Sequence, residues 1–260
     1  MHGDGARNGL RVSLNFFGRE TNHVPALSPK VGFAIQIALH GRVVASTINF
    51  NNKNYDKALA HYKKLEQVAV RKNNVLEGQI GQMRCYYFLG NKTAARDAAN
   101  KVINDPNTPE DIRITAHLWR GRIRMDEEDF IGANNDFNEV LKKGGVSAAE
   151  AKYNIALISY KQGNYKACEA TIFDLIEKYS AFSEWKYKAF LLLSDAYVGL
   201  KDYFQARATL NAILENVDEQ WVRDEALAKL KALDNLEKGE NGTVPGNEEI
   251  EIDLGGQGND

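Results

Sequence analysis

The sequence predicts an all-α protein built from tandem helical hairpins, and two observations predict this fold class. A short phrase at residues 163–168 (GNYKAC) recurs in degenerate form at residues 53–58 (KNYDKA), 128–133 (EDFIGA) and 201–206 (KDYFQA). Around the phrase, apolar residues recur at steps of three and four, as in Ala58, Leu59, Tyr62 and Leu65, which is the period of an amphipathic helix. Such repetition indicates one supersecondary unit whose copies bury their apolar faces by stacking on one another.

Residues 1–41 differ in composition from the rest of the chain and remain an atypical, unassigned segment. Residues 1–50 contain five Lys or Arg but only Asp4 and Glu20 as acids. The alternation over residues 31–39, followed by His40 and Gly41, is typical of a β-hairpin, whereas residues 42–52 can also form the first helix of a repeat. We favour the helix for residues 42–52. A further hypothesis is that these first forty residues do not belong to the parent repeat protein, which the intact mass of the natively produced protein would test.

Residues 42–237 are expected to form the helical repeat domain, and two signals mark helix starts within it. The run from Ser147 to Glu150 (SAAE) matches a capping box, in which both side chains satisfy amides of the first helical turn. Thr108 precedes Pro109 and two acids, which is typical of an N-cap followed by proline at the first helical position. Helices are therefore predicted to start at these two places.

The residues after the last repeat divide into a helix and a tail. Residues 221–236 form an amphipathic pattern that is expected to cap the exposed end of the array. Residues 238–260 contain six glycines and six acids against Lys238, so an acidic, glycine-rich disordered tail is predicted. Within it, residues 250–254 (IEIDL) are either a short docking motif or part of a solubilising tail, and composition favours the second interpretation.

Composition excludes several classes of protein. The 260 residues are 43% hydrophobic and 26% charged, which is enough material for a core of domain size. A formal net charge of -2 leaves no excess of Lys and Arg to neutralise phosphates, so nucleic acid is not an expected partner. The cysteines, Cys85 and Cys168, are too few for a disulfide framework and lack the spacing of a metal site. No apolar run approaches membrane-spanning length.

Catalytic and metal chemistry are not indicated, so we expect no enzyme activity, no cofactor and no metal ion. No two of the five histidines lie three or four residues apart, and neither a phosphate-binding glycine loop nor a nucleophile motif is present. His117 falls at a packing position of its repeat, so partial burial is predicted. The acidic run at residues 126–129 lacks calcium-loop spacing and is predicted to be a solvated turn between helices.

One unit of the array, residues 149–182, places Tyr160, Gly163, Tyr165 and Cys168 at the offsets expected of a known motif. The unit resembles the tetratricopeptide repeat, a helical hairpin of 34 residues with large and small apolar residues at fixed positions. The same frame gives unit starts near residues 39, 76, 114, 149 and 187. The resemblance covers about residues 42–220 and implies a right-handed α-solenoid of about five hairpins. The longer linkers resemble those of bacterial cell-envelope members of the family.

The resemblance also implies a concave groove lined by the first helix of each hairpin. The positions that face the groove in the family, carried over residue by residue, are Arg84, Tyr87, Phe88, Arg122, Met125, Tyr153, Tyr160, Lys161, Lys188, Leu191 and Asp195. Tyrosines beside Arg and Lys suit an extended peptide, because aromatic faces give contact area at low entropy cost and cations bind carboxylates. Tyr153 and Tyr160 can instead pack between hairpins. The Lys and Asn clamp of chaperone-tail receptors is absent from these positions.

We therefore expect a non-catalytic interaction scaffold that binds a peptide or partner protein in the concave groove of a tetratricopeptide superhelix. The alternative is a structural or assembly protein that self-associates into a homo-oligomer through its convex face or repeat ends, in the bacterial cell envelope. Residues 1–10 contain Asp4, Arg7 and three glycines and do not resemble a signal peptide, which favours a cytoplasmic location. A missing N-terminal signal would instead place the protein in the periplasm or envelope.

Overall fold

The computed structural model describes residues 41–241, which contain helices and no strand. Residues 41–51 are helical, in agreement with the helix favoured for residues 42–52 over a strand. The unassigned segment before residue 41, including the alternating run at residues 31–39, lies outside the described residues. The predicted acidic tail beyond residue 241 also lies outside them.

Ten helices follow residues 41–51. The helix at residues 41–51 pairs with α2, the helices α3–α10 pair in succession, and the five hairpins leave α11 over. Their bounds are α2 Tyr55–Val68, α3 Lys72–Phe88, α4 Lys92–Asn104, α5 Glu110–Asp126, α6 Phe130–Leu141, α7 Gly145–Lys161, α8 Tyr165–Tyr179, α9 Ser183–Gly199, α10 Tyr203–Asn216 and α11 Gln220–Asn241. The helices α3, α5, α7 and α9 begin at residues 72, 110, 145 and 183, so their spacings by subtraction are 38, 35 and 38. These spacings equal those of the predicted unit starts from residue 76 onward. The all-α repeat fold is therefore confirmed.

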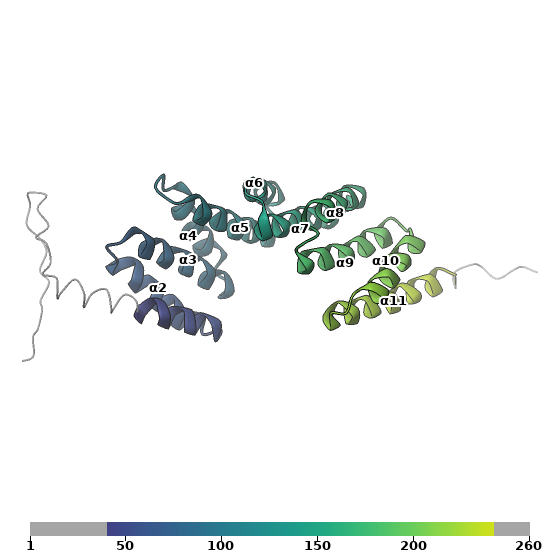
Figure 1. Ribbon diagram of the computed structural model, residues 1–260, viewed down its shortest axis with the longest axis horizontal. Coiled ribbons are helices and arrows are strands. Elements are labelled where there is room, and N and C mark those ends of the chain that lie inside the picture. Colours follow the sequence, from purple (N-terminus) through teal and green to yellow (C-terminus); the bar gives the residue numbers. More distant parts are fainter. Residues whose placement is uncertain (1–40, 242–260) are drawn as a thin grey trace, which may run out of the picture.

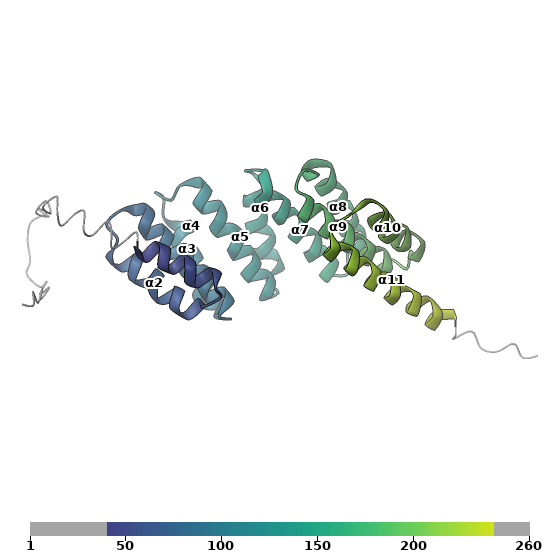
Figure 2. The ribbon, with the colours of Figure 1, turned by 60° about the horizontal axis from the view of Figure 1, so that its bottom comes forward.

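The hairpins stack into an arch whose two ends curve toward the same side (Figure 1). Along the array α3, α5, α7, α9 and α11 each contact the next of the set, whereas no contact joins successive members of α2, α4, α6, α8 and α10. Helices that approach one another must lie on the inside of the curve, and those that diverge must lie outside. The first set therefore forms the inner layer and the second the outer layer, and Figure 2 shows the same stack from another side.

The recurring sequence phrase forms the turn inside four of the hairpins, and residues 90–95 (GNKTAA) form the equivalent turn between α3 and α4. The second residue caps the outer helix in four of these turns, where the side-chain oxygens of Asn91, Asp129, Asn164 and Asp202 accept a backbone N–H three residues ahead. The preceding residue has a positive φ in all five turns, at Lys53, Gly90, Glu128, Gly163 and Lys201. The phrase is thus a left-handed residue followed by a helix cap, which turns the chain sharply into the outer helix.

Two of the predicted helix starts are wrong. The α7 helix begins at Gly145, so Ser147 lies inside the first turn, and Glu150 is buried and pairs with Arg122 of α5 instead of closing a capping box. Before α5 the N-cap position is Pro109 rather than Thr108. The capping helix α11 starts one residue earlier and ends five residues later than predicted, because it spans Gln220–Asn241.

The core consists of layers of apolar side chains within each hairpin and between neighbouring hairpins. The ring of Phe137 on α6 lies directly over Gly121 of α5, where an added Cβ would come within 2.6 Å of the ring. Cys85 and Cys168 are buried and free of disulfides, and burial raises the pKa of each thiol to about 12. Over residues 41–241, no helix combines the length and apolar character needed to cross a membrane.

Candidate functional site

The predicted groove residues lie on the inner layer, and nine of the eleven form two separate sites. The first, the aromatic cluster, consists of Tyr55, Tyr87, Phe88 and Trp119 with the cations Arg84 and Arg122, on α2, α3 and α5. The second, the inner cleft, is a cavity of about 290 Å³ bounded by α7, α9 and α11. Each site thus joins side chains from successive hairpins.

The aromatic cluster is a continuous set of ring contacts around Phe88. The ring of Phe88 stacks on Tyr55 with centroids 4.8 Å apart and planes at 10°. Its edge contacts Trp119 at 5.9 Å, and Tyr87 contacts Trp119 at 5.4 Å with planes at 74°. Phe88 is nevertheless 46% exposed, so the cluster presents an aromatic surface to solvent. Each such edge or stacked contact contributes about 0.5 to 1.5 kcal/mol beyond area burial, which fixes the rings before a ligand arrives.

Two arginines flank the indole of Trp119. The guanidinium carbon of Arg122 lies 4.5 Å from the ring centroid and that of Arg84 lies 5.8 Å from it, both within cation–π range. Arg122 also forms an ion pair with Glu150 of α7 and so links the third hairpin to the fourth. Its charge is therefore partly committed to the fold, whereas no ion pair of Arg84 is found in residues 41–241.

The phenol of Tyr87 is held in its protonated form. Burial raises its pKa to about 12, and its hydrogen bond to Asp126 and the charge of that carboxylate act in the same direction. A protonated phenol donates one hydrogen bond, which here goes to Asp126 at the end of α5. This bond orients the Tyr87 ring at the edge of the cluster.

Four predicted residues, Tyr153, Tyr160, Lys188 and Asp195, meet in the inner cleft. Leu191, also predicted, forms part of its wall, and α11 contributes the side chains of Trp221, Glu225 and Lys229. Both tyrosines also pack against the buried core between α7 and α9, so they contribute to packing and to the cleft wall together. Burial raises the pKa of each tyrosine, which keeps both phenols neutral.

The charges of the inner cleft are paired across helices. Both carboxylate oxygens of Asp195 lie 2.8 Å from the ammonium of Lys229 on α11. Burial raises the pKa of Asp195, although the hydrogen bond and charge of Lys229 oppose this effect. Lys188 lies over the ring of Trp185 at 4.4 Å and pairs with the exposed Glu184 at 2.6 Å. A ligand carboxylate can replace Glu184 as a partner of Lys188 at little cost, because exposed pairs are weak.

Two predicted residues belong to neither site. Met125 packs against the core between α5 and α7, and Lys161 is exposed at the end of α7. Tyr55, Glu225 and Lys229 were not predicted. Neither were three tryptophans, namely Trp119 in the aromatic cluster, Trp221 in the inner cleft and Trp185 beside it. They lie outside the family's groove-facing positions, and the signal that could have found them is their type, because tryptophan on the first helix of a repeat or on the cap is rarely fully buried.

Comparison with known proteins agrees with this architecture. The sequence pattern of the tetratricopeptide repeat family matches residues 188–218, which cover most of α9 and α10. Residues 188–218 thus match the tetratricopeptide repeat family, and the helices on either side repeat the same hairpin. A search of curated proteins gives no match to the chain. The resemblance inferred from the repeat phrase is thereby confirmed, and with it the solenoid fold.

Solved structures of similar fold come from several sources. A tetratricopeptide repeat protein from Parabacteroides merdae is 17% identical, with a TM-score of 0.57, over 82% of this chain and 80% of that one. Repeats of a putative kinesin light chain from Podospora anserina are 12% identical, with a TM-score of 0.57, over 75% and 97%. The Rap conjugation regulator of plasmid pLS20, in complex with the Phr* peptide, is 15% identical, with a TM-score of 0.53, over 87% and 73%.

Proposed function

We propose that this protein is a non-catalytic scaffold that binds an extended peptide segment of a partner protein along its inner face. The observation that carries the proposal is that partly exposed aromatic rings and cations recur together on the inner helices, in the aromatic cluster and again in the inner cleft. Backbone and aromatic side chains of a peptide can contact the rings, while its carboxylates pair with Arg84 and Lys188.

The two sites are preorganised for such binding. The rings of the aromatic cluster fix one another, and Arg122 and Lys229 are held by carboxylates of neighbouring helices. A receptor whose side chains are already ordered loses little conformational entropy on binding, where each mobile side chain would cost about 0.5 to 1.5 kcal/mol. A protein of the same fold, the Rap regulator, is described in complex with a peptide, which supports this mode of use.

The proposal is tested by affinity capture from native lysate with the full chain and two charge-matched variants. The groove variant carries Arg84→Glu and Lys188→Glu, which reverse one cation of each site. The control carries Lys142→Glu and Lys166→Glu, two lysines that are 68% and 72% exposed at the outer helices α6 and α8. Neither variant changes Arg122 or Tyr160. Arg122 neutralises the buried Glu150, and Tyr160 packs against the core, so substituting either would also affect folding.

We expect the groove variant to lose at least tenfold in capture of its partner, and the control to retain it. Equal capture by both variants would contradict groove binding. The rival function, self-association through the outer face, is favoured by one observation: Ile131 and Phe204 on the outer helices are each 79% exposed. Light scattering separates the two, because a dimer that becomes a monomer on Ile131→Glu with Phe204→Glu would support assembly instead.

A further inference from the structure

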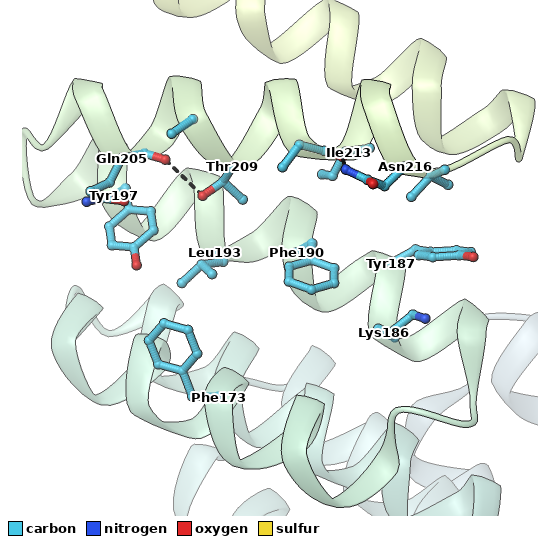
Figure 3. Close-up of a pocket in the computed structure, with 13 residues that line it drawn as sticks. Phe173, Lys186, Tyr187, Phe190, Leu193, Tyr197, Gln205, Thr209, Ile213 and Asn216 are labelled. Carbon is cyan, nitrogen blue, oxygen red and sulfur yellow. Dashed lines mark hydrogen bonds between the residues drawn. The ribbon is translucent and has the colours of Figure 1, made fainter.

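A second groove lies on the opposite face of α9 from the inner cleft. This outer groove is a cavity of about 590 Å³ between α8 and α10, with Phe190, Leu193 and Tyr197 of α9 as its floor (Figure 3). Phe173 forms the α8 wall and is 51% exposed, and the exposed Ala208 and Ala212 lie on the α10 wall. A large apolar cavity with an exposed phenylalanine at its edge is typical of a binding surface.

The equivalent gap two hairpins earlier is closed by polar contacts. The residues of α5 that lie 73 positions before Phe190, Leu193 and Tyr197 are His117, Arg120 and Arg124. There Arg120 donates hydrogen bonds to Asn100 of α4 and to Asp136 of α6, so it joins both walls of the gap. The same position in the repeat is thus used for cross-links in one hairpin and left apolar in another.

The floors of the other two gaps also carry polar side chains, and in each gap these pair with one wall. On α7, Lys152 forms an ion pair with Asp174 of α8 at 2.6 Å. On α3, Gln79 and Gln82 both donate hydrogen bonds to Glu66 of α2. Among the gaps floored by α3, α5, α7 and α9, only that of α9 has an apolar floor. The apolar side chains of this floor are exposed to water, so covering them with another apolar group lowers the free energy.

We propose that residues 250–254 of the same chain bind in the outer groove. In an extended conformation, Ile250, Ile252 and Leu254 share one face, because side chains alternate along a strand. Three apolar side chains in a row match an apolar floor. The two acids between them would face outward, where the ammonium of Lys186 at the far end of the groove can attract them. In the described part of the chain, Lys186 contacts the ring of Tyr187 and forms no ion pair.

The dimensions fit this occupant. The floor from Lys186 to Tyr197 spans eleven helical steps, or about 16 Å, and five extended residues span about the same length. Arg207 of α10 pairs with Asp234 and with Glu237, which fixes the last turns of α11 beside the start of α10. Nine residues from Asn241 to Ile250 can reach about 30 Å. Gln205, at the near end of the groove, is two residues from Arg207.

Cysteine crosslinking in the full chain tests the proposal, because Cys85 and Cys168 are buried thiols with a pKa of about 12 and will not interfere. The test protein carries Ala212→Cys and Ile252→Cys. The control carries Asn211→Cys and Ile252→Cys, since Asn211 is exposed on α10 but does not line the groove. Both are oxidised with copper–phenanthroline in air, matched by circular dichroism, and followed by intact mass and non-reducing electrophoresis.

We expect an intramolecular disulfide in the test protein at least tenfold faster than in the control. Adding Phe173→Glu to the test protein should slow the reaction at least fivefold, whereas Ile131→Glu on an outer helix should not. Equal rates for test and control would overturn the proposal. So would a disulfide-linked dimer as the main product, which would assign the groove to a second copy, and so would a rate indifferent to Phe173→Glu.

Discussion

At the scale of single residues, the buried carboxylate of Asp136 concentrates charge between α5 and α6. It lies 2.8 Å from Nδ1 of His117, 2.6 Å from a guanidinium nitrogen of Arg120 and 2.9 Å from one of Arg124. Burial raises the pKa of Asp136, but the hydrogen bonds from His117 and Arg120 and the charges of both arginines outweigh it and hold the pKa below its ordinary value.

We expect Asp136→Asn to lower the free energy of unfolding at pH 7 by about 3 to 5 kcal/mol, because it leaves buried cations without a counter-charge. A depressed pKa in the folded state contributes stability above the unfolded pKa of about 3.9, and this contribution is lost as pH falls through the folded pKa. The difference between parent and variant should therefore shrink below about pH 4. Urea unfolding from pH 7 to pH 3 measures it.

Asp218→Asn, at an exposed position, is the control and should change stability by less than about 0.5 kcal/mol at either pH. A difference for Asp136→Asn that is the same at pH 3 and pH 7 would contradict the role assigned to its charge.

The sequence predicted the burial of single residues better than their tertiary partners. The partial burial of His117 is confirmed, with 12% of its side chain exposed, because helical periodicity alone places it toward the neighbouring helix. The partner of Glu150 could not be predicted, since Arg122 is 28 residues away and only the stacking of α5 on α7 brings them together. The local motif instead assigned Glu150 to a capping box, because a match to four consecutive residues takes no account of tertiary contacts.

At the scale of elements, the hairpin turns repeat one backbone geometry with different residues. The left-handed position is glycine in two turns, at Gly90 and Gly163, but Lys53, Glu128 and Lys201 adopt φ values of 60°, 61° and 60°. A side chain in this conformation costs about 1 to 2 kcal/mol relative to glycine, less the entropy that glycine loses on folding. The phrase thus tolerates a strained residue in three turns, and in two of them the next residue, Asp129 or Asp202, caps the outer helix.

We expect Lys201→Gly to raise the free energy of unfolding by about 0.5 kcal/mol, because the strain removed exceeds the extra backbone entropy of glycine in the unfolded chain. Gly163→Ala should have the opposite sign and cost about 1 kcal/mol, since no heavy atom lies within 4 Å of its added Cβ and only the backbone conformation is affected. Urea midpoints of the two variants measure both effects. Destabilisation by Lys201→Gly would show that the lysine side chain contributes contacts that outweigh the strain.

Element boundaries were predicted well where this phrase occurs and poorly elsewhere. The outer helices α6, α8 and α10 begin at Phe130, Tyr165 and Tyr203, the aromatic residues of the phrase, because a cap and a left-handed residue fix the start locally. The inner helix α7 begins two residues before Ser147, since Gly144 and Gly145 both adopt positive φ and end the turn earlier. The pair Gly144 and Gly145 was therefore a better signal for the start of α7 than the capping box.

At the scale of the whole molecule, each hairpin contacts only its sequence neighbours, so stability is carried from one interface to the next. The last helix, α11, contacts α9 and α10 and no earlier helix in the described residues. The periodic sequence predicted this linear order and the location of the inner layer, because both follow from copying one unit. It did not predict that α11 forms part of the inner cleft, since a terminal cap has no counterpart in the repeat pattern.

This linear order makes a prediction about α11. Val222 is fully buried between α9 and α10 side chains, whereas Leu227 on the same helix is 54% exposed. We expect Val222→Asp to speed amide hydrogen exchange in α9 and α10 at least tenfold while α3 and α4 stay unchanged, because repeat arrays are coupled through nearest-neighbour interfaces. Leu227→Asp should leave all four helices unchanged. Hydrogen exchange is measured by mass spectrometry on the full chain. Faster exchange in α3 and α4 as well would contradict nearest-neighbour coupling, because it would mean that the arch unfolds as one cooperative unit.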